Sequence, residues 1–76
     1  MDKIYVMDVL VRNGIDKEYL ERNDNWIELG SEEWMEMLSE VVGKNSYESD
    51  NWNEEDNERV MEFRRIIEED FGIECY

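Results

Sequence analysis

The stretch NEEDNERVMEFRRIIEEDF, residues 53–71, is the longest continuous helical pattern in the chain, and the rest of the fold can be worked out from it. On a helical wheel, a repeat of 3.6 residues brings together five apolar side chains: Val60, Phe63, Ile66, Ile67 and Phe71. The opposite face carries Glu54, Glu58, Glu62 and Glu69, interrupted by Arg65. We therefore expect a core-forming helix over 53–71, with Asn53 as its N-cap and an acidic outer face.

A second amphipathic helix is predicted over residues 32–42. Ser31 is a suitable N-cap and Gly43 a suitable terminator. One side of this helix is apolar and comprises Trp34, Met35, Met37, Leu38, Val41 and Val42. The pattern indicates a helix that packs against the 53–71 helix to form the core of the domain.

The first apolar segment, residues 3–11, fits two kinds of secondary structure. As a strand it would have one apolar face, made of Tyr5, Met7, Val9 and Val11. As a helix it would have an apolar stripe made of Ile4, Met7, Leu10 and Val11. Its content of valine, isoleucine and tyrosine favours the strand.

The remaining segments complete a mixed fold. We expect a short helix over 16–21, a brief strand over 26–29 and a final strand over 73–75 that pairs with the first segment. The predicted fold is an α+β domain over residues 1–76, with a small sheet of two or three short strands packed against the helices 32–42 and 53–71. The alternative is an all-α domain of four helices, because each of the four glycines can be placed just after a helix.

The charge of the chain restricts its partners. It has 22 acidic and eight basic residues, a formal net charge of -14, whereas a small soluble domain is typically designed with a charge of roughly 2 to 8 in magnitude. Repulsion among so many negative charges destabilises the compact state. The excess of acidic residues therefore indicates either solubility in a special medium or recognition of a basic partner. Direct binding to nucleic acid is disfavoured, because a phosphate backbone is bound by lysine and arginine.

No catalytic site is predicted, and no cofactor or metal is expected. The chain has no histidine, which removes the commonest general base and the commonest transition-metal ligand. Its one cysteine, Cys75, cannot form an internal disulfide and points to a reducing compartment. The first residues resemble neither a signal peptide nor a membrane span, so we expect a cytoplasmic protein without membrane contact.

Two rows of glutamates are the strongest candidates for a recognition surface. The rows are Glu32, Glu36 and Glu40 on the first main helix, and Glu54, Glu58 and Glu62 on the second. Like charges four residues apart destabilise a helix, although acidic residues in a first turn are favoured by the helix dipole. After the first-turn residues are set aside, the predicted partner-binding carboxylates are Glu36, Glu40, Glu48, Asp50, Glu58 and Glu62. Two aromatic residues, Tyr47 and Trp52, are added to them because they lie beside Glu48 and Asp50 in the loop over 44–52, which we call the acidic loop. Trp52 can also be interpreted as a packing residue, and the whole face as merely solvated.

We interpret this pattern as a non-enzymatic inhibitor that mimics nucleic acid. It would compete for the basic groove of a DNA- or RNA-processing protein, such as a defence nuclease complex. In composition the chain is similar to phage and mobile-element proteins that include anti-CRISPR and anti-restriction proteins. The alternative is an adaptor or regulatory domain that binds a basic protein segment without competing with nucleic acid.

Overall fold

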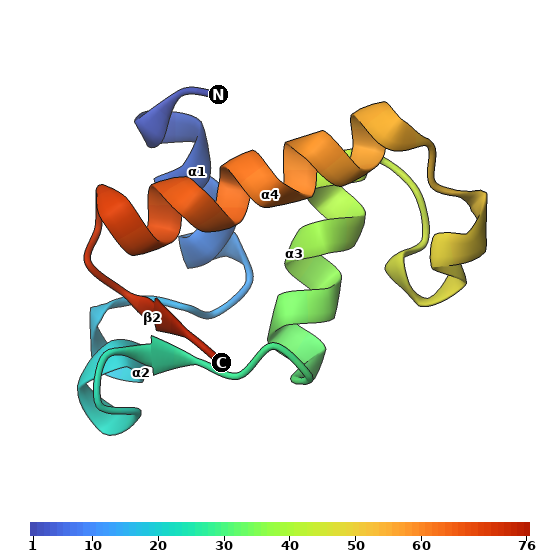
Figure 1. The fold of residues 1–76 in the computed structure, drawn as a ribbon. Helices are drawn as coiled ribbons and strands as arrows, with labels where there is room; N and C mark the ends of the chain where they lie inside the picture. The colour runs from blue at the N-terminus through green and yellow to red at the C-terminus, as the bar shows by residue number, and fades with distance from the viewer.

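The computed structural model describes the whole chain, residues 1–76, apart from the side chain of Ser49. Its elements are four α-helices, one 3-10 helix and two short strands (Figure 1). In chain order they are α1 (Lys3–Arg12), α2 (Lys17–Arg22), β1 (Trp26–Ile27), α3 (Glu32–Val42), η1 (Ser46–Asn51), α4 (Glu54–Glu69) and β2 (Glu74–Cys75).

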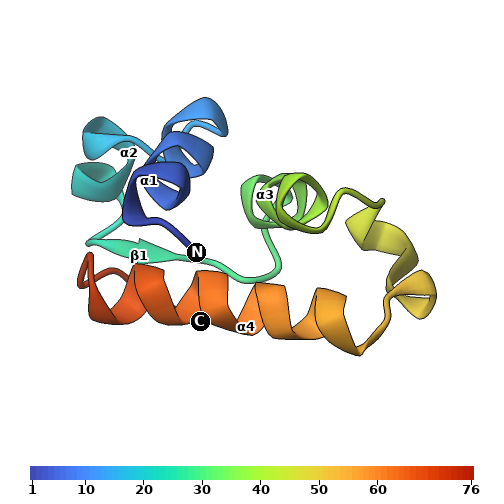
Figure 2. The same ribbon diagram turned by 90° about the horizontal axis from the view of Figure 1, so that it is seen from above.

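Helix α4 runs along the long dimension of the molecule, and the other helices lie on one side of it (Figure 2). Its apolar face is the one that the sequence predicts. Phe63, Ile66 and Ile67 are buried, while Val60 and Phe71 pack against the core from its edge. The ring of Phe63 lies 5.8 Å from that of Trp34 on α3, measured between centroids, so α3 and α4 share the centre of the core.

The ends of α4 follow from its capping residues. Asn53 is the N-cap as predicted: its side chain accepts from the Asp56 amide, and the Asp56 side chain accepts from the Asn53 amide. The helix ends at Glu69, two residues earlier than predicted. Gly72 then adopts a φ of 66°, a left-handed conformation that reverses the chain toward β2.

Helix α3 agrees with its predicted bounds. Ser31 caps it by accepting a hydrogen bond from the Trp34 amide. Gly43 ends it in the left-handed region, with a φ of 72°. The short helix α2 also lies close to its predicted position, with Asp16 as the N-cap.

The sequence favours a strand for residues 3–11, and this prediction is wrong, because the segment is helix α1. Asp2 caps it by accepting from the Ile4 amide, and its inner face buries Val6, Val9 and Leu10. Its outer face is also apolar, with Ile4, Met7 and Val11 exposed. Because apolar residues occupy both faces of α1, their spacing shows no clear helical repeat. The content of β-branched residues then favoured a strand.

The sheet is a two-stranded parallel ladder. Trp26 pairs with Glu74 and Ile27 with Cys75. The final strand therefore forms as predicted, with Ile73 and Cys75 buried, but its partner is β1 and not residues 3–11. The fold is mainly helical with a very small sheet, which agrees with the predicted α+β class only in part.

Candidate partner-binding surface

The predicted carboxylates fall into two groups according to their contacts. Glu36, Glu48, Asp50 and Glu58 are exposed, and none of them forms an ion pair with another described side chain. The other two, Glu40 and Glu62, are engaged within the molecule. The structure therefore divides the six predicted acidic residues into exposed, unpaired members and members that are already partly neutralised.

Glu40 and Glu62 both pair with cations of the N-terminal segment, residues 1–12. The Glu40 carboxylate pairs with Arg12 at the end of α1, and the Glu62 Oε1 lies 2.7 Å from the amine of Met1 before its start. The amine hydrogen bond and its charge lower the pKa of Glu62, and Glu40 raises the pKa of Arg12. These contacts remove the third member of each glutamate row from the unpaired charge.

Five of the exposed carboxylates without an ion pair to a described side chain lie in η1 and in the first turns of α4. We call this group the acidic end and define it as Glu48, Asp50, Glu54, Glu55 and Glu58. All five residues are exposed. Residues 45–58 contain no lysine or arginine, so no cation of this segment offsets them. Glu54 and Glu55 also lie in the first turn of α4, where the positive end of the helix dipole favours negative charge. In Figures 1 and 2 this end, with η1, projects away from the body formed by α1, α2 and the strands.

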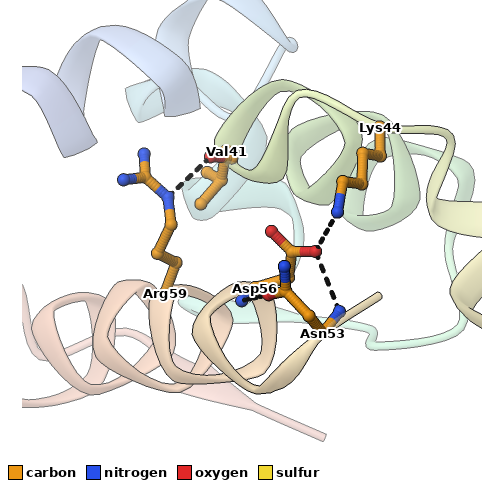
Figure 3. Close-up of polar contacts among 5 residues, drawn as sticks. All are labelled: Val41, Lys44, Asn53, Asp56 and Arg59. Carbon is orange, nitrogen blue, oxygen red and sulfur yellow. Dashed lines mark hydrogen bonds and ion pairs between the residues drawn. The ribbon is translucent and has the colours of Figure 1, made fainter. Parts of the chain in front are cut away.

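A set of hydrogen bonds joins the end of α3 to the start of α4 (Figure 3). Lys44 Nζ donates to Asp56 Oδ2 at 2.5 Å, and Arg59 Nε donates to the Val41 carbonyl at 3.1 Å. Glu55 and Arg59 are four residues apart on α4, a spacing that suits an ion pair, but no such pair is present among the described side chains. The two cations that flank the acidic end in the sequence, Lys44 and Arg59, are thus both engaged at this junction.

Asp56 is the one acidic residue of the chain that is buried. Its pKa is lowered, first by the hydrogen bond from Lys44 and then by the Asn53 amide. A carboxylate with a lowered pKa stabilises the fold at pH values above its ordinary pKa. That contribution is lost as the pH falls through the lowered value, so the junction weakens only in acid.

Helix η1 is attached to α3 through two serines. Ser46 Oγ donates to the Met35 carbonyl at 2.6 Å, and Ser39 Oγ accepts from the Ser46 amide at 2.9 Å. Ser46 is buried although it lies in a polar loop. These bonds, which sequence reasoning did not anticipate, fix the start of the acidic loop against the helix that precedes it.

The two aromatic residues of the acidic loop occupy different environments. Tyr47 is 61% exposed, as a contact residue must be. Trp52 packs against the core, and its buried indole Nε1 has no hydrogen-bond partner among the described residues. The packing role that the sequence left open for Trp52 is therefore present, and its role toward a partner stays a prediction.

Sequence reasoning missed a groove at the other end of α4. It lies between α1, α2 and the turn before β2, and its volume is about 580 Å³. The stripe of Ile4, Met7 and Val11 in the helical interpretation of residues 3–11 was the signal that could have indicated it. No helix within the described residues is long and apolar enough to cross a membrane.

No protein-family model, curated protein or solved structure matches this chain.

Proposed function

We propose that the protein is a non-enzymatic inhibitor that imitates the charge of a nucleic-acid backbone. It occupies the basic groove of a DNA- or RNA-processing protein and competes with the nucleic acid. The observation that carries this proposal is the acidic end, where five exposed carboxylates project on a segment that has no cation of its own.

The charge density of this surface is the physical basis of the proposal. Duplex DNA carries one charge per about 1.7 Å of its axis, whereas carboxylates four residues apart on a helix are roughly 6 Å apart. One helix row is therefore too sparse to imitate a backbone. The acidic end combines carboxylates from η1 with carboxylates from the first turns of α4.

Binding through such a surface has characteristic consequences. A basic groove releases its own counter-ions when carboxylates replace phosphates, and the long-range attraction accelerates association at low ionic strength. We expect tight binding at low salt, a steep loss of affinity as salt is added, and displacement by nucleic acid. Tyr47, exposed among the carboxylates, supplies an aromatic contact of the kind that contributes strongly to interfaces.

The proposal can be tested by affinity retention. The immobilised protein is incubated with a cell lysate from its host at low ionic strength, and the retained proteins are eluted with duplex DNA, with RNA or with polyglutamate. We expect the column to retain a nucleic-acid-binding protein. DNA or RNA should release it at a far lower concentration of negative charge than polyglutamate requires. Retention of basic proteins that polyglutamate releases equally well would contradict mimicry.

Two variants with equal net charge localise the effect. The first neutralises the predicted surface with Glu36→Gln, Glu48→Gln, Asp50→Asn and Glu58→Gln. The second neutralises four exposed carboxylates elsewhere with Asp8→Asn, Glu18→Gln, Glu28→Gln and Asp70→Asn. We expect the first variant to lose the retained partner and the second to keep it. Equal losses would mean that only net charge matters.

A further inference from the structure

Helix α1 has an apolar face that its own fold does not cover. Ile4, Met7 and Val11 are 66%, 48% and 55% exposed and follow the spacing of one helix face. The opposite face is buried in the core through Val6 and Val9. A surface helix normally turns polar residues outward, so an apolar outer stripe marks a place where another molecule docks.

The stripe continues into the groove between α1 and α2. The floor of the groove is apolar and consists of Met7, Leu10, Val11, Leu20, Phe71 and Ile73. Leu20 and Phe71 are only partly buried, so their surface is available from outside. An open apolar floor joined to a helical stripe has the form of the grooves that receive an amphipathic helix.

The rim of the groove has a definite charge. Asp16, Glu21 and Asp24 line it, and Lys17 is the single cation among the lining residues. All three acidic residues are exposed, and none forms an ion pair with a described side chain. An occupant therefore needs apolar anchors for the floor and cations for the rim.

A second copy of this chain does not meet that requirement. Each copy carries a net charge of -14, and both copies would bring acidic rims to the contact. Burying like charges at one interface opposes association. We propose that the groove docks an amphipathic, basic helix of a partner protein, with leucine-like anchors on the floor and lysine or arginine against the rim.

The dimensions of the site suit such a helix. Helix α1 has 10 residues and is therefore about 15 Å long, which matches two to three turns of a helix beside it. Met7 can adapt its flexible side chain to different anchors. The partner's lysine or arginine stems would cover Val11 and Leu20 while their charged ends reach the rim. This inference concerns a second surface and does not depend on nucleic-acid mimicry, and it gives a location to the adaptor function that the sequence left as an alternative.

The test uses a designed peptide as the probe. It is a fluorescent helix of leucine and lysine, with leucine at positions i, i+3, i+4 and i+7, compared at moderate salt with a scrambled peptide of the same composition. Binding is measured by anisotropy, and the contact is located through the methyl signals of the methionines. We expect the amphipathic peptide to bind at least about tenfold more tightly than the scrambled one, because only it presents a continuous apolar face. The Met7 signal should shift, and that of Met61, which is 70% exposed on α4, should not.

Matched variants separate the groove from the acidic end. Met7→Gln with Val11→Gln places a good helix former at both exposed positions and should weaken binding by about tenfold or more. Asp16→Asn, Glu21→Gln and Asp24→Asn retain an N-cap residue at position 16 and should weaken binding several-fold while flattening its salt dependence. Glu48→Gln, Glu54→Gln and Glu58→Gln remove the same charge from the acidic end and should leave peptide affinity unchanged.

Three results would overturn the inference. The first is the absence of any preference for the amphipathic peptide over the scrambled one. The second is binding that the acidic-end variant abolishes and the groove variant does not affect. The third is a concentration-dependent dimer in sedimentation that Met7→Gln with Val11→Gln dissociates, since a second copy would then be the occupant. Failure of nucleic acid to displace a lysate partner would contradict mimicry alone, and it would leave the peptide result unaffected.

Discussion

The two ends of helix α4 differ in almost every physical respect. At its start, the acidic end offers exposed carboxylates on a 3-10 helix and a capped first turn, and hydrogen bonds hold this region in place. At its other end, the chain turns back through Gly72 into a parallel ladder, and an apolar groove lies beside α1 and α2. Charge acts over long distances with little regard for shape, whereas apolar contact acts at short range and requires a fitting surface. The two proposed surfaces would thus use different interactions: long-range charge at the acidic end and short-range apolar contact at the groove.

The largest expected effect comes from a substitution in the core that both ends of α4 share. Phe63 is fully buried and lies against Trp34, so Phe63→Ala should lower the free energy of unfolding by about 3 to 5 kcal/mol. A small domain has little stability to lose, and we expect the variant to be largely unfolded at room temperature. Denaturant titrations followed by circular dichroism measure the change.

The control for this variant is Met61→Ala, which shortens a 70% exposed side chain on the same helix and should change the stability little. In the unmodified protein, amide signals from β2 and from residues 54–58 should disappear at one denaturant concentration. Separate transitions at the two ends would show that they do not belong to one cooperative unit.

The next prediction compares the reactivity of a thiol at each end of α4. Cys75 lies in β2, and burial raises its pKa from 9.0 to about 11. A rise of two units lowers the thiolate fraction at neutral pH by about 100-fold, and only the thiolate reacts with a disulfide reagent. We expect native Cys75 to react at least that much more slowly than the unfolded chain, in an assay with an aromatic disulfide.

A cysteine at the acidic end provides the comparison. Tyr47 is 61% exposed, so a Tyr47→Cys variant that also carries Cys75→Ser should react much faster than native Cys75. Equal rates for the two thiols would mean that Cys75 is as accessible to the reagent as an exposed side chain. That result would show that the β2 end is not packed more tightly than the acidic end.

The smallest effect concerns the N-cap of α4. Asn53→Ala removes the side-chain oxygen that accepts from the Asp56 amide, and it should cost about 1 kcal/mol. Hydrogen exchange should accelerate most in the first turn of α4, while exchange in β1 and β2 should accelerate only through the loss of global stability. Asn53→Ser retains an acceptor and should lose much less. If exchange at β2 increased as much as exchange at the first turn, the cap would not be a local feature of the acidic end.

Those parts of the fold that depend on local pattern could be predicted from the sequence. Helices α3 and α4 have one apolar and one acidic face each, and their caps Ser31 and Asn53 are of the expected residue type. Helix α1 could not be distinguished from a strand, because its exposed outer face is apolar as well as its buried inner face. The pairing of β2 with β1 depends on contacts between residues nearly 50 positions apart, which no local pattern contains.

The candidate surface was predictable to a similar degree. Net charge and the glutamate rows identify the acidic face, and the exposure of Glu36 and Glu58 agrees with it. The pairing of Glu40 with Arg12 joins residues that are 28 positions apart, so it required the three-dimensional structure. The same holds for the groove, whose walls come from α1, α2 and the last turn of the chain.

The bond between Lys44 and Asp56 has a consequence for the entropy of binding. It closes the polypeptide between these residues into a loop, and Ser46 fixes the beginning of that loop to α3. The entropy of restricting the loop is therefore lost when the protein folds, and it is not lost again when a partner arrives. Removing this bond with Lys44→Met would leave the exposed carboxylates unchanged in number, yet Glu48 and Asp50, which lie within the loop, would have more conformational entropy to lose at the moment of contact.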